Sequence, residues 1–318
     1  MRWTVVMFCL GLSLQVQAAC SSLATTPASF GTVTSTALRQ GGQQTSTLQA
    51  GLICSKVVVA LFGTGDHIYL NVSPGSNGLV SAAGDVVTYQ LYADATTATA
   101  LTRGTAFDYA TSSSINLLGL FGNSNPGAPL YMRMTVGNDV PAGIYRETLT
   151  LNWNWNYCST VAVGGACIPA RDIGSAVSTL VVNLTVTNDC VITTTSINFS
   201  SAPVVTAFSS VNASVFLACT KQTAYTIGLN DGNNPLGGRR RMVSGTNFLA
   251  YDLYKGSGIT RWGSVGAERR SSSTADVNPG PGLGNVNQRF DLTARIYSDQ
   301  LTPPAATYLD SVLLDVQF

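Results

Sequence analysis

The chain has 318 residues, of which 45% are hydrophobic and only 10% are charged, and its formal net charge is +1. About a quarter of the residues in an ordinary soluble domain are charged. Three lysines and a near-zero net charge argue against nucleic acid as a partner, because binding phosphates requires clustered basic residues. The single His67 excludes a multi-histidine metal site and argues against a histidine-based catalytic triad. We therefore expect a protein that is not an enzyme and that holds no cofactor or metal.

Residues 1–18 have the pattern of a secretory signal peptide. Arg2 gives a basic start, residues 5–14 form an apolar run, and Ala18 ends a cleavage motif with small residues. The apolar run is too short to span a bilayer, which needs about 20 residues. A lipid anchor at Cys20 is the alternative, and Gln17 argues against it because an aliphatic residue is expected there. The sequence predicts a chain that is exported and is either soluble or part of an extracellular assembly.

Six cysteines remain after the signal peptide is removed, and an even number in an exported protein indicates disulfides. Six cysteines allow fifteen pairings. Pairing sequence neighbours gives Cys20–Cys54, Cys158–Cys167 and Cys190–Cys219. Metal binding is the weaker alternative, because no C-x-x-C spacing occurs and no histidine lies near.

Several segments have the residue pattern of β-strands. Residues 57–62 form a short apolar run that ends at a glycine, which is typical of a strand buried on both faces. Residues 179–187 and 311–318 alternate between apolar and polar positions, which indicates half-buried antiparallel strands. The apolar positions of the two segments are Leu180, Val182, Leu184 and Val186, and then Val312, Leu314, Val316 and Phe318.

The two halves of the sequence repeat one another. Residues 88–92 match residues 250–254, and residues 141–149 match residues 304–312. Each half also opens with a cysteine pair and a phenylalanine. Repeats of this kind indicate copies of one structural unit. The predicted fold is all-β, with a signal peptide at 1–18 and two immunoglobulin-like β-sandwich domains at 19–188 and 189–318.

The halves end differently. In the first half the strand from Tyr145 runs on to Tyr157, and residues 179–187 can return to pair with it. The second half stops at Phe318, directly after the matching strand. We expect a second domain without its final strand, with unpaired backbone groups and an open apolar cleft. Another chain would complete it by donating a strand; the alternative is a six-stranded sandwich that tolerates the gap. The acceptor face would consist of Val312, Leu314, Val316 and Phe318.

The second half also carries a specific set of motifs, and through them it resembles the spore coat protein U domain family. The first half keeps only the Tyr-x-Leu-Tyr and Tyr-x-Glu-Thr parts and resembles a diverged copy. The motifs are Arg240-Arg241-Met242, Tyr251-x-Leu253-Tyr254, Trp262-Gly263 and Tyr308-x-Asp310-Ser311-Val312, together with the pair Cys190 and Cys219.

Two-domain exported members of this family resemble the tip adhesins of archaic, Csu-type chaperone–usher pili. The resemblance implies a periplasmic pilus chaperone, an outer-membrane usher and an adjacent pilus subunit that donates a strand. It also implies export through the periplasm to the cell surface and a place at the pilus tip, with residues 19–188 as the N-terminal adhesive domain and residues 189–318 as the C-terminal pilin domain. Only Ala19 would precede Cys20 in the mature chain, so we expect a subunit that accepts a strand and donates none.

Three apolar segments of the first domain lie between turn-forming residues, and we interpret them as exposed adhesive loops. The alternative is that their side chains fold back onto the core. A disulfide between Cys158 and Cys167 would hold the third loop in shape and reduce the ordering cost of contact. The predicted adhesive residues are Leu79, Val80, Leu117, Leu118, Leu120, Phe121, Val161 and Val163.

The expected function is attachment to abiotic, hydrophobic surfaces, and through it the formation of biofilm. Burial of one leucine or phenylalanine contributes about 1.5–3 kcal/mol, so many pili would act together through avidity. The alternative is a lectin at the pilus tip that recognises a glycan or another receptor. Trp153 and Trp155 could stack on a sugar, but their alternation with Leu149 and Leu151 favours a place in the core.

Overall fold

The structure is a computed structural model that describes residues 20–47, 49–54, 65–110, 128–158, 162–163, 166–167 and 171–318. Between residues 158 and 170 it describes the backbone of the strands but not the side chains. The predicted signal peptide and the predicted strand at residues 57–62 lie outside the described residues. So do five of the predicted adhesive residues, namely Leu117, Leu118, Leu120, Phe121 and Val161.

The described part of the chain consists almost entirely of strands, which confirms the all-β prediction. Its one α-helix is α1 (Ser35–Gln40), whose first turn is capped by Thr34: the Thr34 hydroxyl accepts a hydrogen bond from the Ala37 amide at 3.2 Å. The three 3₁₀ turns are η1 (Val205–Ala207), η2 (Gly266–Glu268) and η3 (Ser272–Thr274).

The first domain has two main sheets, with its core between them. The larger sheet has the order β10 (Ala106–Asp108), β5 (His67–Val72), β12 (Gly143–Cys158), β15 (Arg171–Thr187) and β2 (Ala28–Thr34), and β6 (Leu79–Ser81) and β7 (Val86–Val87) extend it beside β12. The other sheet has the order β3 (Gln44–Thr47), β11 (Leu130–Met134), β8 (Tyr89–Tyr92) and β9 (Ala100–Leu101). Two short pairs are β1 (Cys20–Ser22) with β4 (Leu52–Cys54), and β13 (Ala162–Val163) with β14 (Ala166–Cys167).

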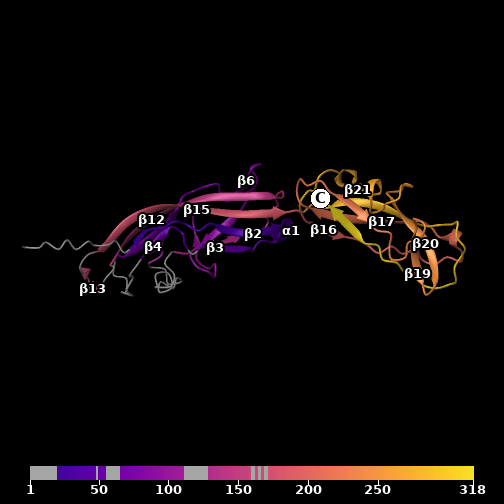
Figure 1. Ribbon diagram of the computed structural model, residues 1–318, viewed down its shortest axis with the longest axis horizontal. Helices are drawn as coiled ribbons and strands as arrows, with labels where there is room; N and C mark the ends of the chain where they lie inside the picture. Colours follow the sequence, from indigo (N-terminus) through magenta and orange to yellow (C-terminus); the bar gives the residue numbers. More distant parts are fainter. Residues whose placement is uncertain are drawn as a thin grey trace, which may run out of the picture.

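The hairpin of β12 and β15 is the longest feature of the first domain (Figure 1). The two strands pair antiparallel without a break, from Gly143 opposite Val186 to Cys158 opposite Arg171. On its other side β15 pairs in parallel with β2. The predicted return strand is therefore present, and it begins eight residues before the predicted start at residue 179, since β15 starts at residue 171.

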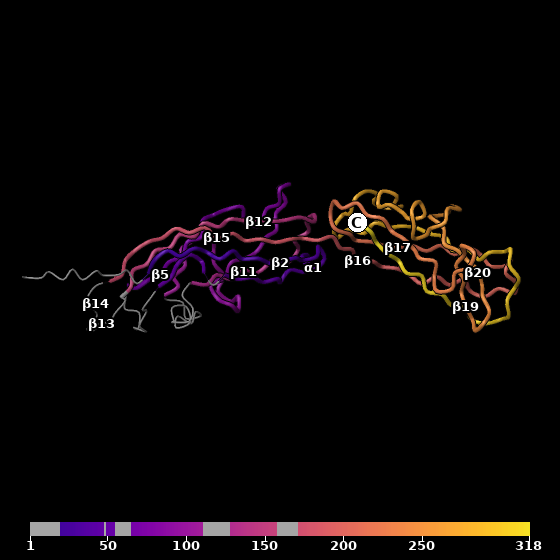
Figure 2. Tube along the Cα trace, in the orientation of Figure 1, coloured from indigo at the N-terminus to yellow at the C-terminus, as the bar shows by residue number. Residues whose placement is uncertain are grey.

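The second domain also has two sheets and a separate core. The larger sheet has the order β16 (Cys190–Thr193), β17 (Val211–Cys219), β22 (Gln288–Ile296), β20 (Asn247–Lys255) and β19 (Arg240–Ser244). The smaller sheet has the order β21 (Arg270–Ser271), β18 (Thr226–Leu229) and β23 (Leu314–Gln317). The two domains lie end to end, and β15 leads directly into β16 between them (Figure 2).

The same contacts recur in the two domains. Tyr145 and Tyr308 each donate from the side-chain hydroxyl to a proline carbonyl four residues earlier, at 2.7 and 2.8 Å. This tyrosine corner is a hallmark of immunoglobulin-like sandwiches. The aromatic rings of Phe30 and Tyr89 meet edge to face, as do those of Phe199 and Tyr251. The structure thus contains two copies of one fold.

Two of the three predicted disulfides are confirmed, Cys20–Cys54 and Cys190–Cys219. Each joins the first strand of its domain to a neighbouring strand, at directly opposed positions. The side chains of Cys158 and Cys167 lie outside the described residues, so the third disulfide stays a prediction. Trp153 and Trp155 are buried in the first core, and the Trp153 indole N–H donates to the Ala50 carbonyl at 2.8 Å.

Candidate functional site: an open sheet edge in the second domain

Strand β23 has a paired side and an open side. It pairs with β18, with Leu314 opposite Leu229 and Val316 opposite Ile227. Within the described part of the chain, no strand pairs with its other side. The equivalent strand of the first domain, β12, has β5 on one side and β15 on the other. The second domain therefore has an unpaired edge where the first domain has β15.

The two domains can be aligned residue by residue along this edge. When Tyr308 is matched to Tyr145, Leu314 falls on Leu151 and Val316 falls on Trp153. The strand pairings agree with this match. Leu151 and Trp153 lie opposite the buried Val72 and Leu70 of β5, as Leu314 and Val316 lie opposite the buried Leu229 and Ile227 of β18.

The hydrogen bonds ahead of β23 show which backbone groups face the open edge. Leu309 exchanges backbone hydrogen bonds with Val243 at 2.9 and 3.1 Å, and Leu313 accepts from the Asn230 amide at 3.0 Å. Both partners lie on the side away from the open edge. Because backbone groups alternate in direction along a strand, the N–H and C=O groups of Tyr308, Asp310 and Val312 point to the open edge.

The opposite wall of the site is the segment of residues 194–203. It corresponds to β2 of the first domain, since Phe199 makes the contact with Tyr251 that Phe30 makes with Tyr89. This segment forms no strand, and no backbone–backbone hydrogen bond joins it to any other described residue. Ile197 and Phe199 pack against the second core as partly buried side chains. The two edges that β15 bridges in the first domain thus both lack a backbone partner in the second.

The predicted acceptor residues have different environments. Val312, Leu314 and Val316 pack against the second core and are partly buried. Leu313, between them, faces the solvent. Phe318 is 55% exposed and does not belong to the core cluster. The alternation predicted from the sequence therefore holds for the first three residues of the set.

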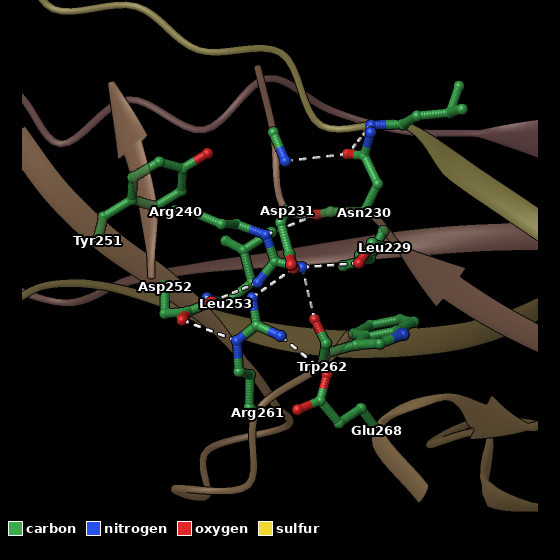
Figure 3. A network of polar contacts seen from close by, with 12 residues as sticks. Leu229, Asn230, Asp231, Arg240, Tyr251, Asp252, Leu253, Arg261, Trp262 and Glu268 are labelled. Atoms are coloured by element: carbon green, nitrogen blue, oxygen red, sulfur yellow. Dashed lines mark hydrogen bonds and ion pairs between the residues drawn. The ribbon is translucent and has the colours of Figure 1, made fainter. Parts of the chain in front are cut away.

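A buried charged network lies beneath this site (Figure 3). Arg240 and Asp252 are fully buried and form an ion pair. The Arg240 guanidinium also donates to the carbonyls of Leu229, Asn230 and Trp262, each at 2.8 Å. Leu229 ends β18, whereas Arg240 and Asp252 belong to the larger sheet. The network therefore connects β18, the strand that pairs with β23, to the larger sheet. It also pairs a charge that would be costly to bury alone.

Arg261 extends the network to the surface. Its guanidinium bonds to Asp252 at 2.9 Å, to Asp231 at 2.6 Å and to Glu268 at 2.8 Å. Burial lowers the pKa of Arg261, but the hydrogen bonds to Asp231 and Asp252 outweigh burial and raise the pKa. Arg261 thus remains a cation and offsets the buried Asp252 carboxylate.

A second polar contact fixes the open edge itself. The Tyr251 hydroxyl donates to Asp310 at 2.8 Å, as the Tyr89 hydroxyl donates to Glu147 at 2.6 Å in the first domain. Burial, followed by this hydrogen bond to Asp310, raises the pKa of Tyr251. The Asp310 carboxylate also accepts from the Asn233 amide at 2.9 Å. The repeated acidic residue is therefore structural in both domains.

The motifs of the sequence contained these residues without revealing their roles. Arg240 lies in a run of three arginines that reads as a solvated loop, although its side chain is fully buried. Asp252 is the variable position of the Tyr-x-Leu-Tyr motif. The signal in the sequence is the acidic Asp252, at a strand position that alternation places on the solvent-facing side although the residue is buried.

The prediction for Leu79 is wrong. Leu79 lies in β6, is 0% exposed and belongs to the first core, because β6 pairs with both β7 and β12. Val80 is partly buried in the same strand. The flanking turn residues mark the ends of a short strand and not an exposed loop. Val163 lies in β13, and its side chain is outside the described set.

The described residues that border the remaining predicted adhesive segments lie at one end of the first domain. The Tyr109 amide donates to the Ile68 carbonyl at 2.9 Å, and Ile68 pairs with Trp155 near the end of β12. Tyr109, close to the last described residue before residues 111–127, therefore lies near the end of β12 that leads to β13 and β14. This end of the first domain is the one farther from the second domain (Figure 1).

His67 takes part in a local surface contact. Its ring stacks on Tyr69, with ring centroids 4.3 Å apart, and its Nε2 lies 3.3 Å from the Asn154 side-chain oxygen. Among the described residues, no group of three or more histidine, cysteine or acidic side chains could hold a metal ion. No helix in the same part of the chain is long and apolar enough to cross a membrane.

Comparison with known proteins agrees with this architecture. The family model of the spore coat protein U domain matches residues 6–152 and again residues 176–315. The chain therefore belongs to the spore coat protein U domain family, and it contains two copies of the domain. No curated protein matches the chain.

The chain is also similar to solved structures of fimbrial proteins. One is the CsuC–CsuE chaperone–tip adhesion subunit pre-assembly complex from the archaic chaperone–usher Csu pili of Acinetobacter baumannii, with 28% identity and a TM-score of 0.63 over 94% of this chain and 100% of that chain. Another is CfaE, the adhesive subunit of the CFA/I fimbria of enterotoxigenic Escherichia coli. It is 11% identical with a TM-score of 0.27 over 92% of this chain and 98% of that chain, too slight a likeness to carry an argument.

Proposed function

We propose that this protein is the adhesive tip subunit of a surface pilus assembled by a chaperone–usher pathway. Its role is structural and not enzymatic, and its route leads through the periplasm to the cell surface. The observation that carries the proposal is the open edge of β23, at the place where the repeated first domain has β15. The likeness to a complex of a chaperone with a tip adhesion subunit supports the same assignment.

The partners follow from the open edge. An edge with free N–H and C=O groups and an apolar face is completed by an added strand, which supplies hydrogen bonds and apolar side chains together. A periplasmic pilus chaperone would supply that strand before assembly, and the adjacent pilus subunit would supply it at the outer-membrane usher. A strand in the place of β15 would run antiparallel to β23 and parallel to residues 197–203.

The first domain would carry the adhesive surface. Its residues Leu117, Leu118, Leu120, Phe121, Val161 and Val163 would supply the apolar contacts, and the described residues that border them lie at the end of the first domain far from the second domain. Attachment would be to abiotic, hydrophobic surfaces and would promote biofilm formation. Each buried leucine or phenylalanine contributes about 1.5–3 kcal/mol, and many pili on one cell multiply the effect.

Strand acceptance can be tested on the full chain by fusing an alternating apolar strand after Phe318 through a Gly/Ser linker. The fused strand should raise the unfolding temperature of the second domain. The matched control is a strand of the same composition with the apolar and polar positions exchanged, which turns the apolar side chains outward. Equal unfolding temperatures for the two fusions would contradict strand acceptance.

The adhesive surface can be tested by replacing Leu117, Leu120 and Phe121 together with serine. Cells that carry the variant should lose most of their attachment to hydrophobic plastic. Replacement of Val136 and Ile144 with serine is the matched control, since these apolar side chains are 77% and 68% exposed outside the predicted loops. Unchanged attachment would contradict the hydrophobic mechanism, and inhibition by a free sugar would favour the lectin.

A further inference from the structure

The hairpin of the first domain has an unusual distribution of side-chain size. Near the far end of β12, Trp153 lies opposite Ala176 and Trp155 lies opposite Gly174. A Cβ atom at Gly174 would collide with the Trp155 ring. Strand β15 must therefore carry small residues there, because the two indole rings already fill the space between the sheets.

The second domain has smaller side chains at these positions. Val316 stands where the first domain has Trp153, and Phe318 stands where it has Trp155. The large ring in this part of the second core, Trp262, donates at 3.1 Å to the carbonyl of Ile227. Ile227 lies on β18, on the side of Val316 away from the open edge. In the first domain a tryptophan thus fills the core beside β15, whereas in the second domain a valine occupies the equivalent position.

The other half of the edge changes less in residue size. Tyr308 corresponds to Tyr145, whose cross-strand partner is Leu184, and Val312 corresponds to Leu149, whose partner is Leu180. Leucine therefore fits opposite both positions in the first domain, and the residues at the two positions of the second domain leave at least as much room. The largest difference in side-chain size between the two sites lies at the end with Val316.

From this difference we propose that the second domain selects a donor strand with a bulky apolar side chain opposite Val316. The proposal rests on strand acceptance by the second domain, and it names the partner by the chemistry of its strand. A donor shaped like β15, with glycine and alanine at this end, leaves space beside Val316. Unfilled space in a core costs both transfer and cavity free energy.

The same feature disfavours binding of β15 from a second copy of this chain. Strand β15 fills the equivalent place in the first domain, and every copy of this chain carries it. Its small residues match Trp153 and Trp155 and mismatch Val316. Specificity often rests on such a mismatch with the wrong partner. The second domain therefore favours another subunit over β15 of a second copy.

Fluorescence anisotropy with labelled peptides and the full chain tests the selection. The first peptide has the sequence of residues 171–187, and the second carries Ala176→Leu. We expect the second to bind at least about tenfold more tightly, which corresponds to about 1.4 kcal/mol. The matched control carries leucine in place of Ser175, which faces outward opposite Asn154, and should bind like the first peptide.

A reciprocal variant keeps the test decisive. Val316→Trp should reverse the preference, so that the unmodified peptide binds more tightly than the Ala176→Leu peptide. Equal binding of both peptides to the unmodified chain would overturn the selection and leave strand acceptance intact. Failure of every alternating peptide to bind would overturn strand acceptance and the selection together.

Discussion

The two domains are built from the same repeat, yet one completes its own sheet and the other does not. In the first, β15 covers β12 over its whole length and joins it to β2. In the second, no described strand bridges β23 and residues 194–203, and the buried ion pair of Arg240 and Asp252 helps to connect the two sheets. The second domain can therefore be well packed on one side and still depend on another chain for its last strand.

The largest effect is expected when the buried network is broken. Arg240→Met should destabilise the second domain by about 3–5 kcal/mol, because it removes one of the two cations that pair with the buried Asp252 and leaves the carbonyls of Leu229 and Trp262 without their donor. The first domain should keep its stability. Calorimetry of the full chain measures both transitions. The matched control is Arg239→Met, which removes an exposed ion pair with Asp299 and should change little; equal losses for the two variants would contradict the role of the network.

A second difference is expected between Leu180→Ala and Val312→Ala. Leu180 is fully buried against Leu149, so its truncation should cost about 2–5 kcal/mol. Val312 packs on one side only, so its truncation should cost clearly less in the free chain and more once a donor strand is bound. Denaturant unfolding with and without the donor peptide measures both. If the cost of Val312→Ala were the same with and without the donor peptide, that result would argue against an open acceptor site.

The tyrosine corners should differ in strength. Tyr145→Phe removes a hydroxyl that bonds to the Pro141 carbonyl at 2.7 Å in a buried setting, and a net loss of about 0.5–1.5 kcal/mol is expected. Burial raises the pKa of Tyr145 to about 12. Tyr308→Phe removes the matching bond at an exposed position and should cost less. Chemical unfolding of the two variants ranks them, and the reverse order would contradict the comparison.

The smallest effect concerns acid. Burial raises the pKa of Asp94, but hydrogen bonds from Thr96, Thr99 and Ala98 outweigh it and lower the pKa to about 2. The ionised carboxylate therefore stabilises the first domain fully above about pH 4, and this stability is lost as the pH falls toward 2. The second domain has no aspartate at the matching position. Asp94→Asn should flatten this part of the stability–pH curve of the first domain, and an unchanged curve would contradict the assignment.

Much of the architecture follows from the sequence, because alternation over residues 179–187 and 311–318 and the repeated tyrosine motifs are local signals. The start of β15 could not be predicted. Between residues 173 and 178 the outward positions carry Ile173 and Val177, whereas the inward ones carry Gly174 and Ala176. This inverted pattern arises because the inward residues must fit against two tryptophans, which is a tertiary constraint.

The sites were less predictable than the strands. Leu79 lies between turn residues, as an exposed loop residue would, yet pairing with β12 buries it. Arg240 belongs to a charged run, and its burial depends on Asp252, twelve residues away, and on carbonyls of another strand. Contacts of this kind between distant residues leave no local pattern.

Hydrogen exchange of backbone amides in the full chain tests the central comparison most directly. The amides of Tyr145, Glu147 and Leu149 face β15, and those of Tyr308, Asp310 and Val312 face the open edge. We expect slow exchange for the first three amides and fast exchange for the last three, which become protected when a donor strand binds. Equal protection of both sets in the free chain would contradict this expectation.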